Sequence, residues 1–186
     1  MEKYLPPPRV LRQILSYDAE TGRLVWKRRS LEFFYNGNNR AERTCRSWNT
    51  KYEGKEAFTC VCNGYKTGAV FGKALTAHRV IWAIVKDHWP AGEIDHVNGN
   101  RSDNRIENLR CVSFSENQRN RAIPKNNTSG SCGVYWDKSR DKWKAAIHVN
   151  GKAVNLGRFN TFDEAVFVRK SAEKNNSYHK NHGRKS

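Results

Sequence analysis

A polar break in the sequence constrains the fold of this chain more than any other feature. Residues 123–131 read IPKNNTSGS, and they separate two regions that carry regular apolar patterns. A cluster of Pro, Asn, Thr, Ser and Gly is typical of a linker. In a chain of 186 residues, this break predicts two small units, each with a modest core. We assign residues 1–122 to the first unit, 132–176 to the second and 177–186 to a basic tail.

The charge of the chain indicates its partner. The sequence has 34 Lys and Arg against 18 Asp and Glu, a formal net charge of +16. Such a surplus favours a polyanion, so nucleic acid is the expected partner, although a solvated basic surface is the plainer alternative. No apolar run approaches the roughly 20 residues of a membrane span. Because the start MEKYLPPPRV also lacks the apolar stretch of a signal peptide, we expect a cytoplasmic protein without membrane contact.

The cysteines favour free thiols over a zinc site. They are odd in number and include no C-x-x-C pair: Cys45, Cys60, Cys62, Cys111 and Cys132. A structural zinc site normally uses two such close pairs. The alternative is that Cys60 and Cys62 join a distant pair of ligands.

Apolar spacing predicts the elements of the first unit. Val10, Leu11, Ile14 and Leu15 recur at helical spacing behind a run of prolines, and Leu24 and Trp26 alternate as in a strand. We expect residues 28–56 to be irregular. Further along, the patterns predict a hairpin at residues 64–73, a helix at 77–85, strands ending near Asp95 and covering 109–114, and a helix that carries Asn117. Ser113 with Glu116, or Ser115 with Gln118, can cap that last helix.

Several chemically active side chains lie between residues 93 and 120. Asp95 and Asn117 offer a carboxylate and an amide oxygen, which are hard ligands suited to Mg²⁺ or Mn²⁺. The neighbouring His96 can take a proton from water near neutral pH. Phosphodiester hydrolysis needs such a base, together with a cation that stabilises charge on the phosphate. Each residue alone is weak evidence, because an Asp-His pair is more often incidental surface.

Taken together, these residues resemble the HNH (ββα-metal) endonucleases of the phage homing and mobile type. The resemblance covers roughly residues 60–122 and rests on AHR, IDHVNGNRSDNRIENLR and SENQRN. It implies that His96 is the general base and that Asn108 holds the loop around it. It also implies that Asp95 and Asn117 bind one Mg²⁺ or Mn²⁺, and that the products carry 5′-phosphate and 3′-hydroxyl ends.

Two positions depart from the usual pattern of that family. Asn117 stands where the last His is common, and Asn98 stands where many relatives have Asp. For His78, a packed histidine and a substrate contact both remain open.

The second unit is predicted to be a three-stranded sheet packed on one helix. Asn150-Gly151 is a strong hairpin signal, and Thr161 with Glu164 forms a capping box at the start of a helix. Alternation places on the helix side Val134, Trp136, Trp143, Ala145, Ile147, Val149, Val154 and Leu156. The opposite face is polar and basic, with Tyr135, Lys142, Lys144, His148 and Asn155.

Residues 133–174 resemble the Apetala-type DNA-binding domain of plant ethylene-response factors. The matched pieces are GVYW, DKWKAAI, LGRF and TFDEAVFVRKSAE. The resemblance implies that the polar face, with Tyr135, Lys142, Lys144, His148 and Asn155, lies in the major groove of DNA. The alternative is an ordinary solvated sheet face.

The sequence therefore predicts an α+β protein with a ββα-metal unit followed by a small antiparallel sheet on one helix. We expect a metal-dependent endonuclease that cuts double-stranded DNA, uses one Mg²⁺ or Mn²⁺ and no small-molecule cofactor, and belongs to a mobile or phage-borne element. The main alternative is a DNA-binding regulator with an inactive HNH fold. RNA binding is a third possibility, which the lack of an RNP-like or G-x-x-G signature disfavours.

Overall fold

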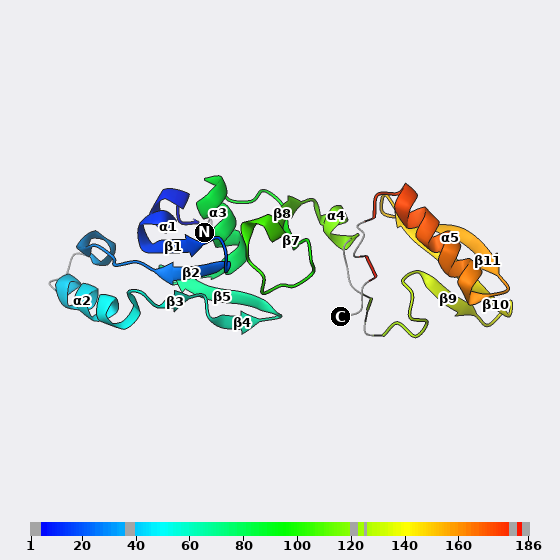
Figure 1. Cartoon of the computed structure of the whole chain (residues 1–186), viewed down its shortest axis with the longest axis horizontal. Helices are drawn as coiled ribbons and strands as arrows, with labels where there is room; N and C mark the ends of the chain where they lie inside the picture. The colour runs from blue at the N-terminus through cyan, green and yellow to red at the C-terminus, as the bar shows by residue number, and fades with distance from the viewer. Residues whose placement is uncertain (1–4, 36–39, 120–122, 125, 179–181, 184–186) are drawn as a thin grey trace. The chain divides into compact units, whose positions relative to one another are not determined.

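The computed structural model describes the chain except for residues 1–4, 36–39, 120–122, 125, 179–181 and 184–186, and it leaves out the side chains of Ser115 and Gln118. The chain divides into two compact units, residues 1–111 and 112–186. The segment 123–131, which we expected to join two units, lies inside the second of them. Each unit combines helices with small sheets, which confirms the α+β class (Figure 1).

The first unit begins with a helix and a three-stranded sheet. Helix α1 (Pro8–Ile14) has prolines at its entrance, as predicted, and leads directly into β1 (Leu15–Asp18). Strand β2 (Arg23–Trp26) pairs with β1 and with the short β3 (Glu56–Ala57) in the order β1-β2-β3. The expectation of an irregular segment at 28–56 was wrong. A 3-10 turn, η1 (Leu31–Phe34), and a helix, α2 (Ala41–Tyr52), occupy most of it.

A second sheet and a helix carry the chain to the motif region. Strands β4 (Cys60–Cys62), β5 (Tyr65–Val70) and β6 (Lys73–Thr76) form an antiparallel meander, and α3 (Ala77–Lys86) follows at once. The predicted hairpin and helix are both confirmed. The main core lies between α1, α3 and the two sheets, and its fully buried side chains include Leu11, Ile14, Val70, Val80 and Ile81.

The motif region adds a two-stranded sheet of β7 (Glu93–His96) and β8 (Leu109–Val112). Arg79, which follows His78 on α3, donates hydrogen bonds to the carbonyl oxygens of Gly92 (3.0 Å) and Pro90 (3.2 Å). These bonds fix the segment that leads into β7, so α3 sets where Asp95 and His96 lie. A 3-10 turn, η2 (Ile106–Asn108), immediately precedes β8.

The second unit contains α4 (Phe114–Gln118), a sheet and α5 (Phe162–Asn175). Strands β9 (Val134–Asp137), β10 (Lys142–Val149) and β11 (Lys152–Phe159) are antiparallel in the order β11-β10-β9, and α5 packs on them (Figure 1). Asn150 and Gly151 form the two-residue turn between β10 and β11 at φ values of 50° and 77°. The side chain of Thr161 accepts a hydrogen bond from the Glu164 amide, which confirms the capping box.

The core of the second unit is smaller than we predicted. Val134 and Ala145 are buried with Ala165 of α5, and partly buried aromatic rings surround them. Trp136 and Val154, which we placed under the helix, are each 41% exposed. Alternation identifies the face on which a side chain lies but not how far a helix extends over that face. Trp136 packs instead against Trp143, with ring centroids 5.3 Å apart.

Candidate active site

The loop between β7 and β8 is held by the side chain of Asn108. Its Oδ1 accepts a hydrogen bond from the Asn98 amide (2.9 Å), and its Nδ2 donates to the carbonyl of Asp103 (2.8 Å). Its backbone carbonyl accepts from the Val97 amide at 2.9 Å. Asn108 is 6% exposed, so these bonds lie largely out of water. One buried amide therefore joins both ends of the loop that begins directly after His96.

The carboxylate of Asp103 also stabilises this loop. Asp103 accepts hydrogen bonds from Arg105 at both Nε (2.9 Å) and Nη2 (2.7 Å), and from Asn98 Nδ2 (2.8 Å). Hydrogen bonding to Arg105, the largest cause, lowers the pKa of Asp103 to about 2. Asn98, which departs from the usual pattern of the resembled family, therefore has a defined role as a bridge within the loop.

The imidazole of His96 is buried and held by a neighbouring amide. His96 is 3% exposed, and its Nε2 lies 3.2 Å from Oδ1 of Asn104. With the amide oxygen of Asn104 as the acceptor, Nε2 carries the proton and the lone pair of the ring lies on Nδ1. Burial is the largest cause of a lowered pKa for His96. The arrangement keeps the ring neutral, which is the state a general base requires.

His78 packs against His96 as part of a ring cluster. The two imidazole centroids are 5.3 Å apart at an interplanar angle of 88°, and Tyr65 lies 5.0 Å from His78 and 5.8 Å from His96. His78 Nε2 is 3.2 Å from the hydroxyl of Thr76. Burial, followed by the nearby His96, lowers the pKa of His78 to about 3. These contacts match a packed histidine that is neutral at physiological pH.

Asp95 forms an ion pair rather than an open ligand position. Arg110 of β8 donates from Nε (2.8 Å) and Nη2 (2.6 Å) to Oδ2 of Asp95, whose side chain is 8% exposed. A carboxylate is a ligand that Mg²⁺ and Mn²⁺ prefer, so the donor chemistry fits. Among the residues described, no three His, Cys, Asp or Glu side chains gather into a metal site. A cation at Asp95 would therefore need amide, water or phosphate oxygens as further ligands, and Arg110 would compete with it.

Asn117 lies on α4, which belongs to the second unit. The amide of Ser113 donates to the Glu116 carboxylate (2.9 Å), and the amide of Glu116 donates to the Ser113 hydroxyl (3.3 Å). The first of the two predicted capping pairs is thus confirmed. The side chain of Asn117 is partly exposed. The structure brings Asp95, His96 and Asn108 together within the first unit, and Asn117 is described with the second.

The N-terminal strands contact the loop between β7 and β8. The hydroxyl of Tyr17 on β1 accepts from the Ile106 amide (2.8 Å) and donates to the Asn104 carbonyl (3.4 Å). In the β1–β2 turn, Gly22 has φ +70°, and a Cβ there would lie 2.7 Å from the Arg105 nitrogen. Sequence reasoning missed Tyr17, since its contacts join residues 87 and 89 positions apart. It also missed Asn104 and Arg110, which lie inside the motif but whose types alone gave no role.

The polar face of the second unit has the composition we expected. Tyr135, Lys142, His148 and Asn155 are exposed, and Lys144 is half-buried. Lys144 pairs across the sheet with Tyr135, and its Nζ lies 5.6 Å from the centroid of that ring. Arg158 pairs with Lys144 on the other side and forms a 2.8 Å ion pair with Asp137. Arg158 therefore adds a cation to this face that the sequence analysis did not include.

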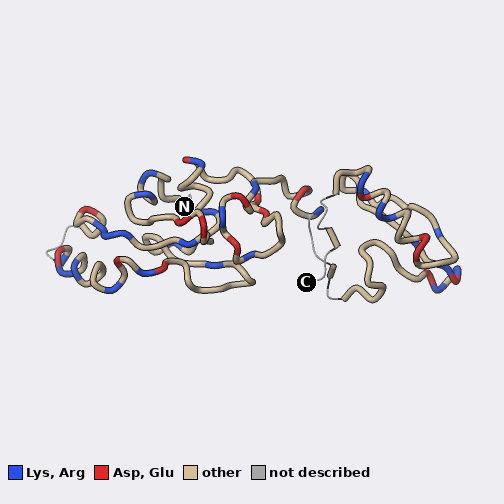
Figure 2. The backbone as a smooth tube through the Cα atoms, viewed as in Figure 1, with Lys and Arg blue, Asp and Glu red and all other residues tan. Residues whose placement is uncertain are grey.

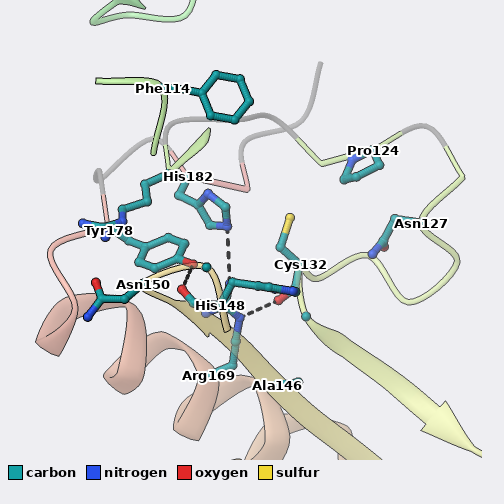
Figure 3. A pocket seen from close by; sticks show the side chains of 13 residues that line it. Phe114, Pro124, Asn127, Cys132, Ala146, His148, Asn150, Arg169, Tyr178 and His182 are labelled. Carbon is teal, nitrogen blue, oxygen red and sulfur yellow. Dashed lines mark hydrogen bonds between the residues drawn. The ribbon is translucent and has the colours of Figure 1, made fainter. Parts of the chain in front are cut away.

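The second unit also contains a pocket of about 1010 Å³, which Figure 3 shows from close by. Arg169 of α5, 4% exposed, donates from Nε to the Cys132 carbonyl (3.0 Å) and lies 3.4 Å from His182. Tyr178 donates to the carbonyl of His148 at 2.7 Å. His182, which we expected in a basic tail, packs on Tyr178 with centroids 4.7 Å apart. The remaining positions of that predicted tail lie largely outside the described residues.

Comparison with known proteins agrees with the geometry around His96. A family model described as HNH endonuclease matches residues 76–119, which include α3, β7, β8 and α4. Protein 3.8 of Escherichia phage T7 is 37% identical over 87 residues, which cover 46% of this chain and 72% of that protein. No solved structure matches the chain. No helix in the described residues has the length and apolar character to cross a membrane. On the motif match, the phage relative and the β7–loop–β8 geometry, the chain belongs to the HNH endonuclease family.

Proposed function

We propose that the chain is a metal-dependent endonuclease that hydrolyses phosphodiester bonds in double-stranded DNA. The observation that carries the proposal is the buried, neutral His96, whose Nε2–H is held by Asn104 beside a loop that Asn108 closes. In this state the lone pair on Nδ1 takes a proton from an attacking water. Asn108 acts on the reaction through His96, because it keeps the start of the loop in place.

A divalent ion supplies stabilisation of the negative charge on the phosphate and the leaving oxygen when it is bound. Asp95, next to His96 on β7, offers a carboxylate whose chemistry suits such an ion. The family resemblance assigns a further ligand to Asn117. Arg110, which shares the Asp95 carboxylate, keeps that side chain oriented and neutralised in the absence of the ion.

We also propose that residues 132–176 bind duplex DNA through the face that carries Tyr135, Lys142, Lys144, His148 and Asn155. Four of these side chains are exposed, and the face has no core to cover. Lysines neutralise phosphates, and an amide or imidazole can contact base edges. The resemblance to the Apetala-type domain supports this assignment.

The test is plasmid cleavage with the purified full chain. We expect cleavage with Mg²⁺ or Mn²⁺ and none in EDTA. His96→Ala should reduce the cleavage rate by about 10²–10⁴-fold, the usual contribution of a general base, while duplex affinity changes less than about twofold. The control is His88→Ala, because His88 is exposed and lies outside the ring cluster. A His96→Ala enzyme that cuts at the wild-type rate contradicts the assignment of the base. Binding without any cleavage by the wild type supports the regulator instead.

A further inference from the structure

An aromatic pocket lies in the first unit, outside the loop around His96. Its volume is about 520 Å³, and it is formed by β2, α2 and the strands β4 and β5. Five aromatic rings line it together with one cation and one carboxylate: Trp26, Trp48, Tyr52, Phe58, Phe71, Arg29 and Glu56. Neither the HNH motif nor the match over residues 76–119 includes any of these residues.

Arg29 is a buried cation that lies against three aromatic rings, among them Phe71, whose centroid is 5.3 Å from the guanidinium carbon. It is 7% exposed, and its guanidinium carbon lies 3.8 Å from the centroid of Trp48 and 4.7 Å from that of Trp26. Asn49 fixes its backbone by bonds to the amide (2.9 Å) and the carbonyl (3.0 Å). In the described part of the chain the Nε atom is buried and has no hydrogen-bond partner. Buried cations normally have a partner, so an acceptor atom of a ligand would complete this group.

Phe71 occupies a backbone position that phenylalanine rarely adopts. Phe71 and Gly72 form the two-residue turn between β5 and β6, with φ values of 50° and 74°. Such turns prefer Asn-Gly, because both central residues need a positive φ. The ring is nevertheless 48% exposed and stacks on Phe33 at 5.8 Å. A bulky residue in this conformation is an outlier, and outliers of this kind cluster at binding sites.

The surroundings of the pocket are basic. Lys27 and Arg28 precede Arg29 in the chain, and α2 carries Arg43, Arg46 and Lys51. Arg28 pairs with Glu53 at 3.2 Å, and Figure 2 shows that Lys and Arg positions outnumber Asp and Glu along α2. Aromatic rings within a basic surface are the usual way in which proteins bind unpaired nucleic acid, since each base offers a flat apolar face. Paired bases in a duplex are already stacked and could not enter.

We propose that this pocket binds an unpaired nucleotide of a DNA strand, whose base packs against Tyr52 and Phe71 while an acceptor atom of the base receives a hydrogen bond from Arg29. The inference rests on the proposal that the chain acts on DNA. It adds a binding site for strands that are not base-paired, at a distinct set of residues from those around His96.

The test measures binding of a labelled thymidine oligonucleotide in EDTA at constant ionic strength. Phe71→Asn should weaken binding by about fivefold or more, because stacking on one ring has that order of effect. The same change should move the thermal midpoint little, since Asn-Gly suits the turn while the contact of the ring with Phe33 is lost. Phe71→Tyr should bind like the wild type. Phe167→Ala, which removes a 72% exposed ring from α5, is the matched control and should have no effect.

An oligonucleotide of the same length with abasic sites separates the base from the backbone. It should bind the wild-type chain more weakly, and it should bind the wild type and Phe71→Asn equally. If Phe71→Asn binds the thymidine strand as tightly as the wild type does, or if the abasic strand binds as tightly as the thymidine strand, the proposal is overturned. His96→Ala should bind the thymidine strand normally. If the thymidine strand binds through Phe71 but the wild-type chain cuts no plasmid, the pocket proposal stands. Only the nuclease proposal is then refuted.

Discussion

Replacing Asn108 by Ala removes two hydrogen bonds at once, and the structure allows the cost to be worked out. The Asp103 carbonyl and the Asn98 amide both lose their partner in the side chain. A buried polar group left without a partner costs about 1–3 kcal/mol. Asn98 itself is exposed, so water can replace part of its bond. We therefore expect Asn108→Ala to lower the free energy of unfolding of the first unit by about 2–3 kcal/mol, toward the lower end of the two-bond range.

The assay combines urea unfolding with amide hydrogen exchange. The Asn98 amide should exchange faster in Asn108→Ala, because its acceptor is gone. Asn49→Ala is the matched control, since Asn49 is also buried (5% exposed) and also holds two backbone groups, both of Arg29. The two variants should lose similar stability. Under single-turnover conditions with excess enzyme, only Asn108→Ala should lose cleavage. Equal cleavage rates for the two variants, or a loss of less than about 0.5 kcal/mol for Asn108→Ala, would refute the reasoning.

Two further predictions concern pH and salt. The pKa of His78 is about 3 in the folded chain and about 6.5 when unfolded, so the unfolded state binds the extra proton and acid destabilises the fold. The stability that the neutral His78 contributes is fully present above about pH 6.5, and it is lost progressively as the pH falls toward about 3. Between pH 7.5 and 5 it amounts to about 2 kcal/mol, and His78→Gln should show a correspondingly smaller loss by urea unfolding at the two pH values. In the second unit, replacing Lys142, Lys144 and His148 by Ala should make the log–log salt dependence of duplex binding shallower by about 1.8, if the two lysines each neutralise one phosphate. An unchanged slope in fluorescence anisotropy titrations would mean that this face does not contact the DNA backbone.

Sequence patterns predicted the elements that have both an apolar period and a clear boundary. Helices α1 and α3, strand β2 and the hairpin at Asn150-Gly151 all have these signals. Helix α2 lacked a clear boundary. Its inward positions Ala41, Cys45, Trp48 and Tyr52 do follow helical spacing, but Arg40 at its start makes no side-chain cap and most of its other residues are polar. The apolar spacing was enough to predict a helix at these positions, but the many charged residues between them made the segment look irregular.

Part of the candidate site could likewise be predicted from the sequence, and part could not. Asp95, His96 and Asn108 could be named from the motif, because a resemblance transfers positions along a chain. The partners that give those residues their properties could not, since Asn104, Arg110 and Tyr65 act through distances and burial that no spacing encodes. For the same reason the exposed fractions of Trp136 and Val154 depended on where α5 begins and ends rather than on strand alternation.

The bonds of Tyr17 to Asn104 and Ile106 have a consequence for grafting the HNH segment onto another protein. The hydroxyl of Tyr17, from the first twenty residues, is the hydrogen-bond partner of the loop that carries the motif. Position 22 favours glycine, because a Cβ there would lie 2.7 Å from the backbone nitrogen of Arg105 in this loop. A graft that transferred only residues 60–122 would leave the Asn104 carbonyl and the Ile106 amide without that partner. The motif segment therefore keeps these two bonds only if Tyr17 and the β1–β2 turn are transferred with it, or if the recipient supplies an equivalent hairpin.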